Sequence, residues 1–169
     1  RKEAYEWLKA NATLKEGPKD GWRAASEEEG LKEVKAWQKK LHEDGWACMH
    51  WPKAYGGREA TPIERVIWGQ EVSKFKVPGG YLEIGQGMAG PVMMMYATEE
   101  QKERYLPPLA TGEEIWCQLF SEPAAGSDVA GIKTKAELDN DTWTINGQKV
   151  WTSGAHFSDY GILVTRSDP

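Results

Sequence analysis

The stretch QLFSEPAAGSD, from Gln118 to Asp128, separates two halves of the chain that follow different patterns. Before it the apolar residues recur at helical spacing, and after it they alternate as they do in strands. The stretch itself follows neither pattern, because Pro123 interrupts a strand and three small residues follow, Ala124 to Gly126. Small residues allow the backbone to come close to a bulky neighbour. We therefore expect this loop to lie against something large.

The residues before the loop predict a helical domain over residues 1–115. Helix starts are marked by three capping boxes, in which two side chains satisfy backbone donors of the first turn: Ser26 with Glu29, Thr61 with Glu64, and Thr98 with Gln101. With the apolar periodicity, these predict helices over Glu3–Ala10, from Ser26 to Gly45, over Pro62–Phe75 and over Glu99–Leu106. The last helix should end at Leu106, because prolines follow it.

Two segments of this half carry expectations about packing. The helix that starts at Pro62 is expected to bury four apolar residues: Ile63, Val66, Ile67 and Val72. The segment Tyr81–Tyr96 is rich in glycine and methionine, which favours close packing beside an adaptable apolar wall. Its Gly85–Gly90 run satisfies the letters GxGxxG. No strand precedes the run, so we reject a dinucleotide site there and favour helix packing.

The second half predicts strands. Trp116–Phe120 is an apolar run of strand length, and alternation from Lys133 to Asp139 continues through a turn into Thr142–Ile145. Asn146-Gly147 is a two-residue hairpin signal, so Gln148–Thr152 should be the return strand, with another strand at Tyr160–Thr165. The predicted fold is therefore α+β: an all-α N-terminal helical domain over 1–115, followed by an incomplete antiparallel β-barrel or sandwich domain over 116–169.

Charge and composition argue against several classes of protein. The net charge is -5 with the two signs interleaved, so the electrostatic footprint of a nucleic-acid-binding protein is missing. No apolar run approaches the length of a membrane span. Cys48 and Cys117 lack metal-ligand spacing and are interpreted as buried free thiols. His42, His50 and His156 form no metal-binding pair, so we expect no metal site.

The ends of the chain suggest a piece of something longer. Residue 1 is Arg rather than Met, and the chain stops soon after the apolar run Ile162–Val164, which has no partner downstream. We expect a soluble protein of the cytoplasm, although a missing N-terminus would hide any targeting peptide.

Two segments could form a binding site. Gln118 to Ser127 offers strand-end backbone groups, the hydroxyl of Ser121 and small residues, and Trp151-Thr152-Ser153 adds an indole and two more hydroxyls. A flat aromatic heterocycle needs one face covered by a ring and its edge met by such polar groups. The alternative is that Ser121 and Asp128 only cap a turn and that Trp151 belongs to the core.

Four linked segments resemble the acyl-CoA dehydrogenase family: WPKAYGG (Trp51–Gly57), TEEQKERYLPPLATGE (from Thr98), QLFSEPAAGSDVAG (from Gln118) and INGQKVWTSGAHFSDYGILVTRSDP (from Ile145). The resemblance covers essentially the whole chain in order. It implies an all-α domain, a middle β domain that holds FAD, and a C-terminal helical bundle. This chain would supply the first domain and about half of the second.

Carried over position by position, the resemblance implies that cofactor-binding residues lie in two segments: Gln118, Leu119, Phe120, Ser121, Glu122 and Ser127 in the loop, and Trp151, Thr152 and Ser153 after it. Ser127 also matches a position that contacts the CoA part of the substrate. The sequence departs from the family's EPGAGSD at Ala124, which asks for a negative φ or a small adjustment there.

The reaction implied is α,β-desaturation of an acyl-CoA thioester, with hydride transfer to flavin N5. The catalytic base is expected beyond Pro169, and Glu122 matches a loop carboxylate rather than the base. The resemblance also implies an electron-transfer flavoprotein as acceptor and a homo-oligomer, dimer or tetramer. Two alternatives stay open: an acyl-CoA oxidase or monooxygenase on the same fold, and a non-catalytic interaction module. The sequence does not reveal the acyl-chain length.

Overall fold

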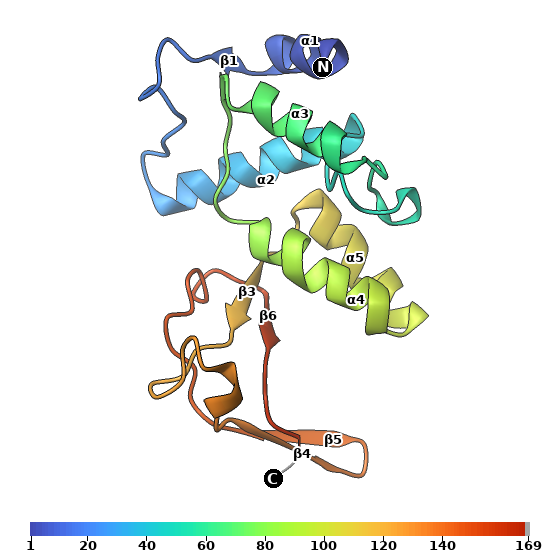
Figure 1. Ribbon diagram of the computed structural model, residues 1–169, viewed down its shortest axis with the longest axis vertical. Helices are drawn as coiled ribbons and strands as arrows, with labels where there is room; N and C mark the ends of the chain where they lie inside the picture. The colour runs from blue at the N-terminus through green and yellow to red at the C-terminus, as the bar shows by residue number, and fades with distance from the viewer. Residues whose placement is uncertain (168–169) are drawn as a thin grey trace. The chain divides into compact units, whose positions relative to one another are not determined.

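The computed structural model of the protein describes residues 1–167. The backbone forms two compact units, Arg1–Glu113 and Glu114–Pro169. Helices make up most of the first unit, and the longer strands belong to the second (Figure 1). This helical part followed by a β part confirms the predicted α+β class. The domain limits 1–115 and 116–169 stay a prediction.

The first unit is built from five helices: α1 (Lys2–Asn11), α2 (Glu27–Glu43), α3 (Pro62–Val72), α4 (Gly90–Tyr96) and α5 (Glu99–Thr111). A 3-10 turn (Lys53–Tyr55) and a π-helical turn (Gly85–Ala89) lie between them. The two-residue strands β1 (Thr13–Leu14) and β2 (Phe75–Lys76) pair in antiparallel fashion. No helix of the described residues is long and apolar enough to cross a bilayer.

Two of the three predicted capping boxes form completely, and the one at Ser26 forms in part. Thr61 and Thr98 each form a complete box at the starts of α3 and α5, with Glu64 and Gln101 as partners. At the start of α2, the Ser26 hydroxyl accepts a hydrogen bond from the Glu29 amide at 3.2 Å. Each cap satisfies backbone donors that a helix start leaves unpaired, which fixes where the helix begins.

The predicted buried side of α3 is wrong at two of its four residues, since Ile67 and Val72 are half-buried but Ile63 and Val66 are exposed. Ile63 is 64% exposed and Val66 is 54% exposed. The helix instead buries Glu71, whose carboxylate pairs with Arg1 and Lys74. Phe75 lies outside the helix, in β2, where its ring is buried. The pairing of β2 with β1 fixes this end of α3, and local periodicity carries no information about that long-range partner.

Helix α5 continues through Pro107 and Pro108 to Thr111, so the predicted end at Leu106 is also wrong. Leu106, Leu109 and Ala110 are all buried, which stabilises a helical path past the missing donors. Side chains from other segments also satisfy carbonyl groups of the last turn. The Gln38 amide donates to Ala110 O at 2.8 Å, and the Gln86 amide donates to Leu109 O at 3.1 Å.

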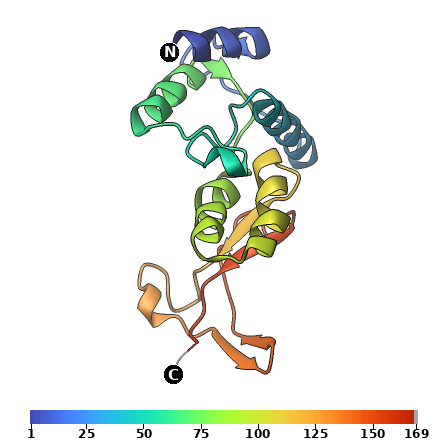
Figure 2. The ribbon, with the colours of Figure 1, turned by 90° about the vertical axis from the view of Figure 1, so that its right-hand side faces the viewer.

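Close helix packing in this unit centres on the indole of Trp51, which is 1% exposed. Its Nε1 donates to Gln86 O at 2.9 Å in the π-helical turn. A Cβ added at Gly90 would lie 2.2 Å from the Trp51 ring, so only glycine fits. This agrees with packing as the role of the glycine run. Helices α4 and α5, which follow it, contact one another and lie side by side (Figure 2).

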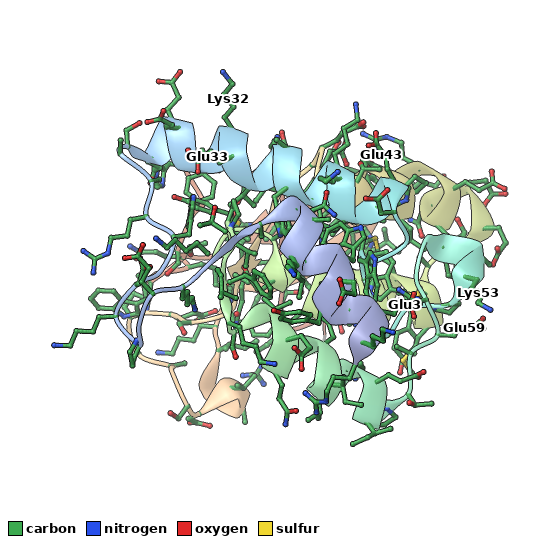
Figure 3. All side chains as sticks on the ribbon, turned by 90° about the horizontal axis from the view of Figure 1, so that it is seen from above. Glu3, Lys32, Glu33, Glu43, Lys53 and Glu59 are labelled. Carbon is green, nitrogen blue, oxygen red and sulfur yellow. The ribbon has the colours of Figure 1, made fainter. Side chains whose placement is uncertain are left out.

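Tryptophans also pack against one another in the first unit. Trp46 and Trp68 stack with ring centroids 4.5 Å apart, and Trp7 lies 5.9 Å from Trp46. Charged residues occupy the outer surface: Lys32 projects away from α2, and Lys53 lies near Glu59 (Figure 3). The Lys53 and Glu59 charges are 3.9 Å apart. Most of the aromatic content therefore serves packing rather than a ligand wall.

The second unit holds two strand pairs. β3 (Trp116–Leu119) pairs in parallel with β6 (Tyr160–Leu163), and β4 (Lys135–Asp139) pairs in antiparallel fashion with β5 (Thr142–Asn146). The predicted turn between β4 and β5 is confirmed, with Asn140 at a φ of 53°. The parallel pair differs from the antiparallel pairing expected, because the chain between β3 and β6 contains the β4–β5 hairpin and returns in the same direction.

The second predicted hairpin, at Asn146-Gly147, does not form. β5 ends at Asn146, and Gln148–Thr152 forms no strand. A Cβ at Gly147 would lie 2.2 Å from the Thr134 hydroxyl, so this glycine serves close approach rather than a turn. The residues after it bond to the loop that follows β3 instead of returning along β5.

Substituting Gly90→Ala should lower the free energy of unfolding by roughly 1–3 kcal/mol, the usual cost of overpacking, because the new methyl group meets the buried Trp51 ring. The matched control is Gly87→Ala, where a Cβ meets nothing within 4 Å. Alanine there should leave stability unchanged or slightly increased. Denaturant unfolding of both variants measures the difference, and equal effects would contradict the packing role of Gly90.

Candidate functional site

The loop after β3 is held by a tight turn. The amide of Glu122 donates to Ala125 O at 2.8 Å, and the Ala125 amide donates back to Glu122 O at 3.1 Å. Ala124, the departure from the family pattern, is not among the residues with positive φ. Gly126 and Ser127, which follow, are exposed, and a Cβ at Gly126 would meet nothing within 4 Å. A ligand could therefore come close to the backbone in this part of the loop.

The carboxylate of Glu122, the first residue of this turn, is buried, and 6% of the side chain is exposed. It accepts hydrogen bonds from the amides of Lys133 at 2.6 Å and Thr134 at 2.9 Å. It also accepts from Lys149 Nζ at 2.8 Å. A buried charge is tolerated only when it is paired and hydrogen-bonded, and this carboxylate meets both conditions.

These partners change the acidity of the group. The Lys149 ammonium, followed by the backbone amides of Lys133 and Thr134, lowers the pKa of Glu122 from its ordinary 4.5 to about 2. Hydrogen bonds and a nearby cation both favour the charged form of a carboxyl group. Glu122 is therefore ionised at neutral pH and has little tendency to take up a proton, so it is unsuited to act as a base.

The second candidate segment is joined to the first by hydrogen bonds. Lys149 Nζ donates to Phe120 O at 2.9 Å as well as to Glu122, and the Val150 amide donates to Ser121 O at 2.9 Å. Two stretches that are about thirty positions apart in sequence thereby become neighbours. The backbone of Gln148–Thr152, predicted as a return strand, takes part in this junction.

Trp151 lies directly after the junction. Its side chain is 89% exposed, and its φ is 56°, in the left-handed region that residues with a Cβ rarely adopt. The interpretation of Trp151 as a core residue is therefore wrong. Backbone strain of this kind persists only where the surrounding structure holds it, and it clusters at functional sites. An exposed indole on a strained backbone offers a flat surface to a ligand.

The structure places the predicted site residues at different depths. Gln118, Leu119, Phe120, Ser121 and Thr152 are half-buried, Glu122 is buried, and Ser127, Trp151 and Ser153 are exposed. Asp128 precedes a 3-10 turn (Val129–Gly131), and its side chain forms no capping bond to it. The hydroxyls of Ser121, Thr152 and Ser153 make no hydrogen bond within the described residues. They are available to a ligand, and the turn-capping alternative is not supported at Asp128.

Sequence reasoning missed one residue of this arrangement. Lys149 was placed within a predicted return strand, yet it connects the two segments through Phe120 and Glu122. Its signal in the sequence is weak: one lysine directly before the apolar pair Val150-Trp151, with two carboxylates, Glu122 and Asp128, in the loop upstream. Nothing in the spacing of these charges shows that Lys149 and Glu122 meet.

Comparison with known proteins gives a consistent result for both units. The acyl-CoA dehydrogenase N-terminal domain matches residues 11–113, and the acyl-CoA dehydrogenase middle domain matches residues 117–169. The chain is similar to the acyl-CoA dehydrogenase IpdE1 of Mycobacterium tuberculosis (strain ATCC 25618 / H37Rv). The two are 40% identical over 142 residues, which is 84% of this chain and 37% of IpdE1.

Solved structures agree with this. The Tcur3481-Tcur3483 steroid ACAD superposes with a TM-score of 0.75 at 32% identity, over 99% of this chain and 42% of that one. A glutaryl-CoA dehydrogenase from Mycobacterium smegmatis in complex with FADH2 has a TM-score of 0.61 at 25% identity, over 82% of this chain and 37% of that one. The chain spans less than half the length of each of these proteins.

The Glu122 pair predicts a specific dependence of stability on pH. Because the pKa of Glu122 in the folded protein is about 2, below its ordinary 4.5, ionised Glu122 stabilises the fold fully above pH 4.5. That contribution is lost as the pH falls through 4.5 toward 2. Glu122→Gln should therefore lower stability at pH 7 and flatten the acid limb of the stability curve.

Thermal unfolding of both proteins between pH 2 and pH 7 tests this prediction, because this range runs from the pKa of Glu122 in the folded protein to neutral pH. The matched control is Glu137→Gln, which changes an exposed carboxylate on β4. The control should keep the wild-type acid limb. A Glu122→Gln variant with an unchanged acid limb would contradict the assigned role of the buried pair.

Proposed function

The chain belongs to the acyl-CoA dehydrogenase family, and from this premise we propose that it is part of an FAD-dependent acyl-CoA dehydrogenase. The proposed reaction is α,β-desaturation of an acyl-CoA thioester. One observation carries the proposal: the two segments expected to bind the flavin are hydrogen-bonded to each other, and the exposed Trp151 follows their junction. Family members are oxidoreductases and flavoproteins that act in lipid metabolism.

The residues present suit a flavin. A flat ring system requires an uncovered aromatic or apolar surface and hydrogen-bonding groups at its edge. Trp151 supplies the first, and the hydroxyls of Ser121, Thr152 and Ser153 supply the second. The glutaryl-CoA dehydrogenase similar to this chain is a complex with FADH2, which supports the same cofactor here.

We assign FAD binding to both segments: Gln118, Leu119, Phe120, Ser121, Glu122 and Ser127, with Trp151, Thr152 and Ser153. The loop backbone and the hydroxyls would orient the ring, and Trp151 would cover part of it. When bound, FAD accepts the β-hydrogen of the acyl group as a hydride. Within this set, the role of Glu122 is to hold the loop, because all of its described contacts are internal.

The substrate side of the proposal rests on Ser127, whose exposed hydroxyl we assign to the CoA part of the thioester. The acyl group itself is a separate question. One protein similar to this chain is named a steroid ACAD, so a steroid-derived acyl-CoA is the first class to assay beside straight-chain thioesters.

The catalytic base is not assigned within this chain. Glu122 is the one carboxylate among the residues assigned to the flavin, but its pKa of about 2 makes it a poor acceptor of the α-proton. We propose that a glutamate outside residues 1–169 removes that proton. On this proposal the 169-residue chain alone is inactive and holds FAD weakly.

Electrons would leave through an electron-transfer flavoprotein, and the working protein would be a homo-oligomer in the cytoplasm. The nearest alternative is an acyl-CoA oxidase or monooxygenase on the same fold. Stopped-flow reoxidation distinguishes them: a dehydrogenase should pass electrons quickly to an electron-transfer flavoprotein and slowly to oxygen. Fast reaction with oxygen would favour the oxidase or monooxygenase.

Ser121→Ala and Thr152→Ala should each weaken FAD binding to the intact protein about two- to ten-fold, which corresponds to the usual net value of one hydrogen bond. Isothermal titration with FAD measures the change. The matched control is Thr144→Ala, an exposed hydroxyl on β5 outside both segments. Unchanged FAD affinity in both site variants would favour the non-catalytic module that only keeps the fold.

A further inference from the structure

The Lys149 side chain is buried more deeply than a lysine normally is, with 7% of it exposed. Its Nζ donates to Phe120 O at 2.9 Å and to Glu122 Oε1 at 2.8 Å, both on the loop after β3. We propose that Lys149 is a positioning residue that holds the two flavin-binding segments in the arrangement that the cofactor needs. This inference rests on the proposed function.

The position of Lys149 in the chain gives it this role. The next residue, Val150, donates its amide to Ser121 O at 2.9 Å, and the residue after that is the strained, exposed Trp151. Lys149 and Val150 therefore fix the backbone immediately before the strained residue. On the other side, the Ser153 amide donates to Trp151 O at 3.0 Å. The positive φ of Trp151 is held from both sides.

The charge of Lys149 matters as well as its length. An ammonium group has three donors, and two of them reach acceptors on one loop that are two residues apart, Phe120 O and the Glu122 carboxylate. A neutral apolar side chain would leave both acceptors short of a donor in a buried position. The carboxylate would keep the amides of Lys133 and Thr134, so the start of β4 would remain attached to the loop.

Removal of the ammonium should therefore act locally. The link between the loop and Val150–Ser153 loosens, while the link between the loop and β4 persists. Once free of its anchor, Trp151 can return to a negative φ and turn its indole away from the loop. FAD affinity should fall even though Lys149 itself makes no contact with the flavin.

The test substitutes Lys149→Met in the intact protein and measures FAD binding by titration. We expect affinity to fall roughly ten- to a hundred-fold, as for the loss of an outer partner of a bound group. Lys149→Cys should show the same loss, and alkylation of that cysteine with 2-bromoethylamine, which rebuilds an amine of nearly the same length, should restore binding. Lys102→Met is the matched control: this lysine, with 13% of its side chain exposed, pairs with Glu99 at 2.8 Å within α5. The control should bind FAD like the wild type.

The outcomes separate the two proposals. A folded Lys149→Met variant with wild-type FAD affinity overturns the positioning role and leaves the proposed function intact. Loss of binding that persists after mass spectrometry shows complete alkylation of that cysteine also overturns it. A wild-type intact protein that binds no FAD overturns both proposals. If the methionine variant does not fold, Lys149→Gln decides: weaker FAD binding in a folded protein supports the positioning role, and unchanged binding overturns it.

Discussion

The buried carboxylate of Glu122 is the interaction on which the second unit depends. Two segments supply its donors, Lys133 and Thr134 just before β4 and Lys149 before Trp151, and both are thereby tied to the loop that contains Glu122. A buried charge that loses one partner is costly, so the segments are constrained together rather than independently. This explains how the chain between β3 and β4, whose one helical element is a short 3-10 turn, keeps a defined shape.

Glu122 has a structural role in the candidate site, and other residues provide the groups that can contact a ligand. Because Glu122 is fully engaged and has a pKa of about 2, it positions groups and does not exchange protons at neutral pH. The groups that remain available are the ones a planar cofactor needs: an exposed indole at Trp151 and hydroxyls at Ser121 and Thr152. In a preorganised site, buried interactions hold the binding groups in place and leave those groups free to contact the ligand.

Local signals in the sequence predicted most of the fold. Capping residues such as Thr61 and Thr98 act within one helical turn, and the alternation of β4 and β5 acts within one hairpin. The errors arose where a distant partner decides the outcome. Gln38 and Gln86 support α5 beyond its prolines, and neither is visible in the local pattern around Pro107.

In the candidate site, too, some features could be predicted from the sequence and others depend on distant partners. Its two segments could be named from the sequence through a family resemblance, which the comparisons confirm at the level of the family. The exposure and positive φ of Trp151, and the pairing of Lys149 with Glu122, could not be predicted. These features depend on hydrogen bonds between segments far apart in the chain. The apolar residues around Trp151 instead suggested a strand, with Trp151 in the core.

We propose that Gln118–Ser127 and Val150–Ser153 form a single flavin-binding surface. Hydrogen–deuterium exchange of the intact protein, with and without FAD, tests it most directly, because exchange reports on both segments at once. We expect FAD to slow exchange in the two segments together and by similar factors. Protection of only one segment, or of neither while FAD is bound elsewhere, would contradict it.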